Sequence, residues 1–520
     1  MRTTTILSVL LAAVSVSAQY ASSTGTELWV TFMENLSLDF NGPPYFELVI
    51  SSDVNTSGSV IVPATNFTVP FTVAAEHATV IELPTNIYYP QGDEDVFNFG
   101  LKVVADDPVS VYAFHHRAYF SEAAMALPTE RLGTEYRVMS HADLDGNSPN
   151  EFVVLATQDG TEVEITPAAL TIGFRPPDVP FTITLDEGQA FQLQAMGDLT
   201  GSTVRSIDPT KRIALFAGAR QADVGCGAGA DDHLYECIPA TADWGKDHIV
   251  VPFKDRGGDV FRFLASEDAT SVQIGLGAPF MLNTGAHRDT LLTAPVRITA
   301  TAPIGVGQFN ESQICNPQNG DASFLWNYPT SFRDDRLIWS SRSGSDLPTG
   351  STPEHFVNVV VSGSAGPSPV TLDGTNVTSL FLPVPGSPGS FYAQLDISEG
   401  EHVLASAARV WATAYGFGDY NSYALPLGFE DVISSIDEGT LPAIATPATA
   451  WLTSSGDELP LSLRMRGELV ITDAAGRTVA RVATVAGAAW PVLPNGCYAL
   501  TFTQLSSGAR MAGRLVLVSR

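Results

Sequence analysis

The sequence predicts an all-β protein, with about four tandem β-sandwich-like repeats followed by a small C-terminal β-sandwich. Three observations predict this class. Apolar and polar residues alternate with a period of two, Gly and Asp turns separate segments rich in β-branched residues, and one pattern of strands recurs four times. No stretch of 12 residues beyond the N-terminal segment combines a helical period with capping residues.

Composition makes several partners poor candidates. The chain has 520 residues, and 56 acidic against 27 basic residues give a formal net charge of −29. Because no basic run is present to displace phosphate counterions, nucleic acid and anionic lipid are poor partners. Only 16% of the residues are charged while 44% are hydrophobic, which indicates a folded chain rather than a disordered acidic tail.

Residues 1–18 are typical of a secretory signal peptide. Arg2 precedes an apolar run from Ile6 to Val14, and Val16 and Ala18 stand at the −3 and −1 positions of a cleavage point. This run is too short to cross a bilayer of about 30 Å, and no later segment reaches 18 uninterrupted apolar residues. We therefore expect an exported protein without a transmembrane helix.

The repeated pattern is a strand, a polar turn and a second strand. Its four copies start 106, 109 and 95 residues apart, at Tyr45, Glu151, Val260 and His355. Each copy continues with an alternating pair of strands and closes on a further apolar strand. Residues 19–428 therefore form a repeat region with units of about 25–132, 133–244, 245–335 and 336–428.

The length of the repeat favours one arrangement of the units. Six or seven strands per unit are enough to bury two inner faces in a β-sandwich. A propeller would use shorter, four-stranded blades, so roughly 100 residues per repeat favours tandem sandwiches. A propeller-like arrangement of the repeats is the alternative, because periodicity does not show how the units meet in space.

Five motifs in the repeat region occur in the order expected for one family. They are GTELWVTFMEN at 25–35, ALPTERLGTEYRV at 126–138, VLATQDGTEVEITP at 154–167, DHLYECIPATADWGKDHIVVP at 232–252 and YGFGDYNSYALPLG at 415–428. Together they resemble the N-terminal domain of the IgGFc-binding protein family. The resemblance implies a binding or adhesive surface module rather than an enzyme, and it carries no set of Fc-binding residues onto this chain.

The C-terminal segment 447–520 has a different pattern. A strand, the turn Asp473-Ala-Ala-Gly-Arg477, a strand, the motif Leu493-Pro-Asn-Gly-Cys-Tyr498 and a basic terminus follow one another. This order resembles the type A sorting domain of the Bacteroidota type IX secretion system, although Thr446-Pro447-Ala448 replaces the usual Asn-Pro opening. Residues 429–446 would then be the linker. The resemblance implies secretion or display on the outer cell surface, with the type IX machinery as a partner.

Four cysteines occur, at 226, 237, 315 and 497. An exported protein meets oxidising conditions in which a disulfide persists. We predict the most local pair, Cys226 with Cys237, while Cys315 could compete for either of them. Cys497 lies in the C-terminal segment and is interpreted as a small buried apolar residue.

One loop suggests a hard cation. Asp143, Asp145, Asn147 and Glu151 place oxygen donors at alternate positions, as calcium loops do. Ser148 departs from the glycine of the EF-hand pattern, and the same residues make ordinary solvated turns. Calcium is therefore a hypothesis for this loop, and no other cofactor is predicted.

A second hypothesis concerns the loop from Asp231 to Trp244. Asp231, Asp232 and His233 suggest a metal or acid–base group, but no nucleophile motif accompanies them. We interpret the adjacent pair His115 and His116 as polar residues at a strand end. We interpret Asp93-Glu94-Asp95 as a solvated charge run. We interpret a set of aromatic residues as packing residues, with stacking on sugars as the alternative; the set is Tyr415, Phe417, Tyr420 and Tyr423.

Three functions remain from these patterns. The leading one is a secreted or cell-surface, non-enzymatic binding or adhesion protein that recognises an extracellular protein or glycan through loops on a rigid scaffold. The alternatives are an exported hydrolase of extracellular polymers and a structural component of a surface matrix.

Overall fold

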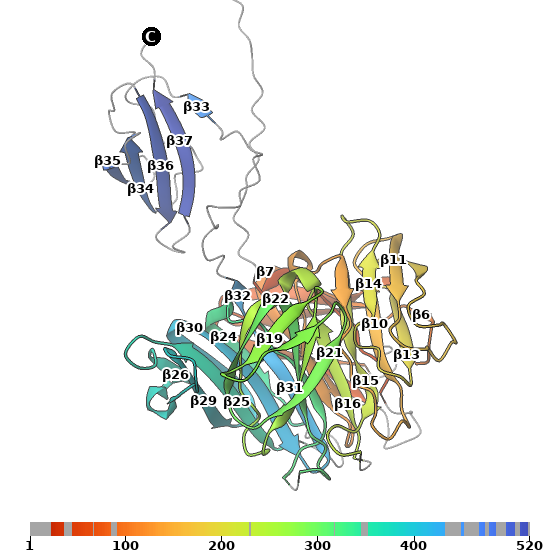
Figure 1. Ribbon diagram of the computed structural model, residues 1–520. Helices are drawn as coiled ribbons and strands as arrows, with labels where there is room; N and C mark the ends of the chain where they lie inside the picture. The colour runs from red at the N-terminus through yellow and green to blue at the C-terminus, as the bar shows by residue number, and fades with distance from the viewer. Residues whose placement is uncertain are drawn as a thin grey trace, which may run out of the picture. The chain divides into compact units, whose positions relative to one another are not determined.

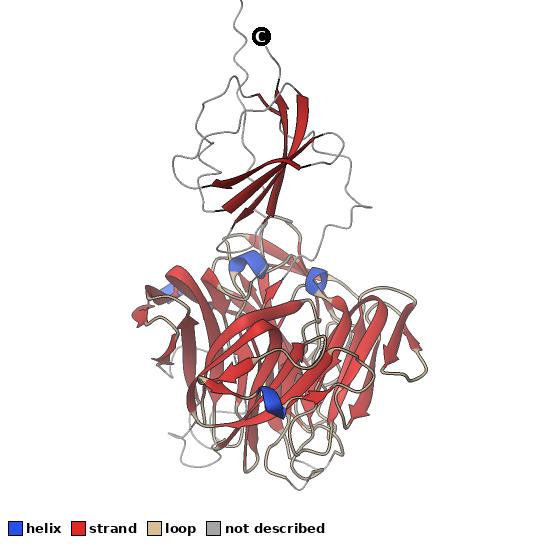
Figure 2. Cartoon of the chain, turned by 90° about the vertical axis from the view of Figure 1, so that its left-hand side faces the viewer, coloured by secondary structure: helices blue, strands red, loops and turns tan. Residues whose placement is uncertain are grey.

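A computed structural model describes residues 22–35, 44–65, 67–84, 91–227, 230–316, 318–344 and 352–431, together with five strands between 449 and 517 (Figure 1). The chain divides into two compact units, 1–434 and 435–520. The predicted signal peptide and most of the predicted linker lie outside the described residues. In the described part, strands supply nearly all of the regular structure and the only helices are four short 3-10 turns (Figure 2). The predicted all-β class is confirmed.

The first repeat unit is a seven-stranded antiparallel sheet that folds over at one long strand. Strand β7 pairs with β1 and β3 along its first half and with β2 and β8 along its second half. Strands β4 and β5 complete the two halves by pairing with β3 and β2. The bounds are β1 (Gly25–Val30), β2 (Tyr45–Ser52), β3 (Thr56–Val62), β4 (Phe67–Val73), β5 (His77–Leu83), β7 (Leu101–His116) and β8 (Glu122–Met125).

A corner in β7 separates the two halves. Asp106, Asp107 and Pro108 are exposed at this corner, and the register of β1 jumps from Val104 to Val109 as it passes them. Proline has no N–H to donate to a ladder, so it is tolerated where a strand bends. Corresponding prolines lie at the corners of the second and third units, at 209 and 303.

The second unit repeats this topology as two separate sheets, because its long strand is interrupted at the corner. The orders are β16-β15-β10-β13-β6 and β12-β11-β14-β9. Strand β6 (Val96–Phe97) comes from the first unit and pairs with β13. The other bounds are β9 (Glu135–Arg137), β10 (Asn150–Ala156), β11 (Thr161–Thr166), β12 (Phe181–Leu185), β13 (Ala190–Ala195), β14 (Thr203–Ser206), β15 (Ile213–Ala222) and β16 (Asp232–Ile238).

The third and fourth units each have a long bent strand, β22 and β30, that pairs in both halves. The third unit comprises β17 (Gly245–Val250), β18 (Asp259–Ala265), β19 (Thr270–Ile274), β20 (Phe280–Leu282), β21 (His287–Leu292), β22 (Val296–Asn310) and β23 (Ser323–Trp326). The fourth comprises β24 (Phe332–Ser341), β25 (Glu354–Ser362), β26 (Val370–Leu372), β27 (Thr375–Asn376), β28 (Leu382–Pro383), β29 (Ser390–Ile397), β30 (Gly400–Gly418), β31 (Asn421–Leu427) and β32 (Glu430–Asp431).

One strand near the end of each unit lies at a shared centre. Strand β8 packs against β16, β16 against β23, β23 against β31, and β31 returns to β8, so these four inner strands form a closed ring. The four units therefore surround one centre. In this respect the propeller-like alternative describes the placement of the units better than separate sandwiches in tandem, although each unit is larger than a propeller blade.

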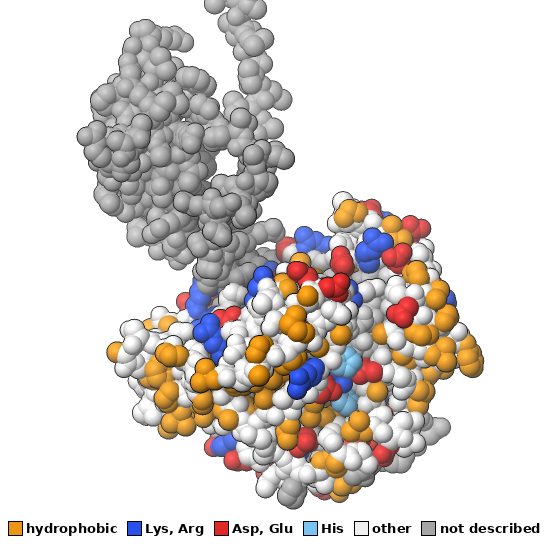
Figure 3. Space-filling view, in the orientation of Figure 1, with side chains coloured by type: hydrophobic (Ala, Val, Ile, Leu, Met, Phe, Trp, Pro, Cys, Tyr) orange, Lys and Arg blue, Asp and Glu red, His pale blue; other side chains and the backbone are white. Residues whose placement is uncertain are grey.

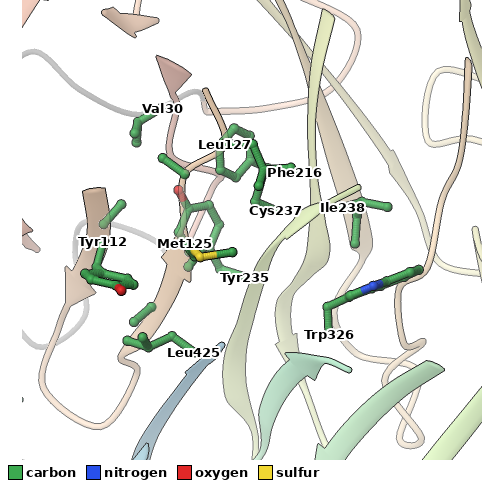
Figure 4. Close-up of a cluster of buried hydrophobic side chains, with 14 of the residues drawn as sticks. Val30, Tyr112, Met125, Leu127, Phe216, Tyr235, Cys237, Ile238, Trp326 and Leu425 are labelled. Atoms are coloured by element: carbon green, nitrogen blue, oxygen red, sulfur yellow. The ribbon is translucent and has the colours of Figure 1, made fainter. Parts of the chain in front are cut away.

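The apolar core follows the ring. One continuous buried cluster includes residues of all four units, and a separate cluster fills the third unit around Phe261 and Phe263. Figure 4 shows part of the main cluster, where Met125, Tyr235 and Trp326 come from three different inner strands. Because the units share a core, we expect them to stabilise one another.

The C-terminal unit has a five-stranded sheet of order β33-β37-β36-β34-β35, in which only β33 and β37 are parallel. Its strands are β33 (Thr449–Trp451), β34 (Gly467–Asp473), β35 (Thr478–Thr484), β36 (Gly496–Gln504) and β37 (Arg510–Leu517).

Candidate functional site

The inner strands carry buried carboxyl groups at the centre. Each inner strand pairs along one edge with the long strand of its own unit, so the N–H groups of its other edge need acceptors. Glu122 accepts hydrogen bonds from the N–H groups of Phe324 and Ala424, at 2.9 and 2.8 Å, which links the first unit to the third and fourth. Its Oε1 also accepts from the N–H of Ala123, at 3.1 Å.

Two acids on β16 act in the same way. Glu236 accepts from the N–H of Trp326 at 3.0 Å, and Asp232 accepts from the N–H of Ser422 at 3.2 Å. Glu122, Asp232 and Glu236 are fully buried, and burial raises the pKa of each well above its ordinary value. These groups close the ring, and none is accessible to a substrate.

The predicted acid–base pair of the hydrolase alternative lies inside this core. His233 is fully buried, its Nδ1 lies 3.2 Å from the carbonyl oxygen of Arg220, and burial lowers its pKa to about 4. Half of the segment predicted as a loop from 231 to 244, including Asp232 and His233, is strand β16. Asp232 and His233 therefore offer no open site.

The predicted disulfide is wrong. Cys226 is bonded to Cys315, across 89 residues, and Cys237 is a free, buried thiol on β16 (Figure 4). Cys237 points into the apolar core of the inner strands, and burial raises its pKa well above the ordinary value. The loop that holds Cys226 instead lies beside the loop that follows β22, where the N–H of Ser312 donates to the carbonyl of Val224 at 2.9 Å. Packing between units, rather than distance along the chain, selects the partner.

The four residues predicted to bind calcium differ in their surroundings. The carboxylate of Asp143 accepts from the N–H groups of Asn147, Ser148 and Asp223, as in a turn cap, while the Asp145 and Asn147 side chains are exposed. Glu151 is buried in β10 and accepts from Gln194 Nε2 at 2.6 Å. In the described ranges no three His, Cys, Asp or Glu side chains could hold a metal ion together. Calcium binding by this loop stays a prediction.

The structure shows the surroundings of two smaller groups from the sequence, a histidine pair and an aromatic set. His115 and His116 lie at the end of β7, as predicted, and both are buried. His116 Nε2 lies 3.1 Å from Glu47 Oε2. The aromatic set is packing: the first, second and last members are at most 2% exposed and only Tyr420 reaches the surface.

Asp93 and Glu94 hold a loop of the second unit. Asp93 Oδ2 accepts from the N–H of Gly173, and Glu94 accepts from Thr171 Oγ1 and from Arg175 Nε, at 2.7 to 2.9 Å. The predicted solvated charge run thus fixes the connection between β11 and β12.

The connection between β11 and β12 exposes apolar side chains, and the corresponding segments of the third and fourth units also expose apolar side chains. The segments between β11 and β13, between β19 and β21, and between β26 and β29 expose large apolar side chains to solvent (Figure 3). Phe174 is 82% exposed and Leu276 is 89% exposed. The other members are Leu170, Ile172, Val179, Met281, Leu380 and Leu382. We call these three segments the apolar loops.

A cavity of about 520 Å³ lies where the third and fourth units meet. Lys254 and Asn319 line it from the third unit, and Glu354, Phe356 and Asp396 line it from the fourth. Its residues come from separate connections and strand ends, and no sequence motif predicts them. We call it the interunit cavity.

One acid near the centre gives a pH prediction. Burial raises the pKa of Asp321 from 3.8 to about 7, Asp231 raises it further and Arg256 opposes the shift. The folded state binds this proton more tightly than the unfolded state, so the contribution of Asp321 to stability is present at low pH and is lost as the pH rises from about 4 to 7.

Asp321→Asn cannot titrate. As the pH rises from 5 to about 7, this variant should gain unfolding free energy relative to wild type by about 1.4 kcal/mol per pH unit, and the difference should then stay constant up to pH 8. Urea denaturation at the lowest and highest of these pH values measures the difference, with the exposed Asp95→Asn as control. Parallel pH profiles for wild type and Asp321→Asn would contradict the shift.

The fold and its centre define a class: a multi-unit all-β protein whose inner strands carry buried carboxyl groups and whose apolar loops expose large side chains. A model of the family described as IgGFc binding protein matches residues 122–416, more than half of the chain. The chain belongs to the IgGFc binding protein family, and the predicted family is confirmed.

Individual relatives are distant. The human IgGFc-binding protein is 23% identical over 419 residues, which cover 77% of this chain and 7% of the human protein. A solved anti-sigma factor domain-containing protein from Clostridium clariflavum covers 72% of this chain and 98% of its own at 10% identity, and its TM-score of 0.11 is too low to support an inference. No α-helix in the described part of the chain has the length and apolarity needed to span a bilayer.

Proposed function

We propose that this chain is an exported, non-enzymatic binding protein that recognises an extracellular protein or glycan. The observation that carries the proposal is the repeated position of the apolar loops, which expose large side chains in three of the four units. Exposed apolar groups on well-anchored loops are typical of recognition surfaces. The name of the human relative refers to binding of IgG Fc. The match covers only 7% of the human protein, so most of that protein has no counterpart in this alignment.

The apolar loops are built to stay in place. The second-unit loop has side-chain hydrogen bonds to Asp93 and Glu94, and Arg175 lies 3.8 Å from the ring centroid of Phe181. The apolar loops of the third and fourth units are neighbours, because Gly386 of the fourth unit lies next to Leu276 of the third. A Cβ atom added to Gly386 would be 3.8 Å from Leu276 Cγ. Anchored loops lose less conformational entropy on binding than mobile ones.

Export belongs to the same proposal. The signal peptide at 1–18 and the type IX sorting domain at 447–520 would place the protein outside the cell or on its outer surface. The sequence motifs support this route, and residues 435–520 form a compact unit of their own.

Turnover assays test the non-enzymatic part. The full chain, incubated with polysaccharide and peptide substrates, should release no product above background. If it does, and if Asp232→Asn and His233→Gln abolish the release, the hydrolase alternative is right. Both variants need matching circular dichroism spectra, because both residues are buried.

A further inference from the structure

The interunit cavity has walls that are already ordered. Arg256 is 1% exposed, and its five N–H groups donate to Asn310 Oδ1 and to the carbonyl oxygens of residues 311, 318, 319 and 320. This saturated guanidinium fixes the loop that carries Asn319. The Cys226–Cys315 disulfide ties the same loop to the second unit.

Close packing joins this loop to the fourth unit. The N–H of Gly320 donates to the carbonyl of Gly418 at 2.7 Å. Gly320 has a φ of +108°, and a Cβ atom there would lie 2.5 Å from the ring of Phe417. On the opposite wall, the N–H of Lys254 donates to the hydroxyl of Tyr415 at 3.0 Å. A cavity with fixed walls is pre-organised for a ligand.

The carboxylates of the cavity disfavour an anionic ligand. Asp255, Glu354 and Asp396 line the cavity, and Lys254 Nζ pairs with Asp396 Oδ1 at 2.5 Å. The buried Arg256 also lines it, but its N–H groups already donate to the loop. An anion would meet three carboxylates. A cationic ligand would meet Lys254, whose Nζ already lies 5.4 Å from the ring centroid of Phe356.

The remaining groups fit hydroxyls. A sugar hydroxyl both donates and accepts hydrogen bonds. The carboxylates can accept from such hydroxyls, and the ammonium group of Lys254 and the amide group of Asn319 can donate to them. Phe356 is partly exposed and packs on Tyr415 and Phe417, which gives the floor an apolar surface. The volume of about 520 Å³ falls within the range of small-molecule sites, about 300–1,000 Å³.

We propose that the interunit cavity binds a neutral carbohydrate, with Glu354 and Asp396 accepting hydrogen bonds from sugar hydroxyls, Asn319 and Lys254 donating to them, and the exposed edge of Phe356 in apolar contact with the sugar. This inference rests on the proposed binding function and names a ligand class for one site.

The test uses the full chain and an array of neutral oligosaccharides, sialylated and sulfated oligosaccharides, and basic peptides, followed by titration calorimetry on any sugar bound. Binding to neutral oligosaccharides alone is the expected result. The Glu354→Gln/Asp396→Asn variant should bind the same sugar about tenfold more weakly or worse, because hydrogen bonds to charged groups are lost. Both side chains are exposed, so folding should be unchanged, and the exposed Glu162→Gln is the matched control.

Three results would overturn the proposal: no binding of any neutral sugar, binding of basic peptides only, or neutral-sugar binding that the double variant leaves unchanged. The proposed function fails separately. If a protein ligand binds the full chain while no sugar does, the binding function stands and only the carbohydrate assignment falls.

Discussion

Replacing Glu122 with alanine is expected to lower the unfolding free energy by about 3 kcal/mol or more. The substitution leaves three buried N–H groups, on Ala123, Phe324 and Ala424, without their acceptor. Each buried unsatisfied group costs about 1–3 kcal/mol. Because the three groups belong to three inner strands, the loss should weaken the closure of the ring rather than one unit alone.

Urea denaturation of the full chain measures this loss. Glu122→Gln should be less damaging, since one oxygen still accepts, but its NH₂ group faces an N–H donor and cannot restore wild-type stability. Glu162→Ala, at an exposed position, should change stability by less than about 0.5 kcal/mol. Equal stabilities for Glu122→Ala and Glu162→Ala would show that the central carboxyl does not hold the units together.

The second large effect concerns the disulfide. Cys226→Ser, Cys315→Ser and the double variant should each lose about 2–4 kcal/mol, since the bond closes a loop of 89 residues in the unfolded chain. The three variants should be alike, because either substitution removes the same bond. Reductant should destabilise the wild type and leave the double variant unchanged.

Peptide mapping without reduction identifies the partners directly. The expected cross-linked peptide contains Cys226 and Cys315, with Cys237 recovered as a free thiol. A Cys226–Cys237 peptide would contradict the structure and restore the sequence prediction.

Local patterns predicted the strands and the repeat because both depend on neighbouring residues. Alternation in segments such as Phe181–Leu185 and the recurrence of similar strands about every hundred residues are visible in a single chain. The ring is different. It depends on contacts between β8, β16, β23 and β31, which lie about a hundred residues apart in the sequence. The repeat predicts that each strand exists but does not predict which of these strands are in contact.

The same limit explains the errors at the site. Cys237 was the nearest partner of Cys226 in sequence, but its strand turns the thiol into the core. Asp232 and His233 had the composition of a catalytic pair, and only the closed ring shows that they are sealed. One signal in the sequence could have indicated the central acids. Glu122 and Glu236 are isolated acids in apolar strands, and a buried carboxyl group must accept hydrogen bonds from nearby donors. The interunit cavity had no such signal, because Lys254, Glu354 and Asp396 meet only in the folded chain.

The binding function is tested most directly by probing a protein and glycan array with the full chain and with an apolar-loop variant, Phe174→Ser/Leu276→Ser/Leu382→Ser. Saturable binding of at least one extracellular ligand, released chemically unchanged, is the predicted result. Its affinity should fall on the loop variant, or on the cavity variant Glu354→Gln/Asp396→Asn if the ligand is a neutral sugar. Conversion of an array ligand to product, lost in Asp232→Asn, would contradict a non-enzymatic binding protein.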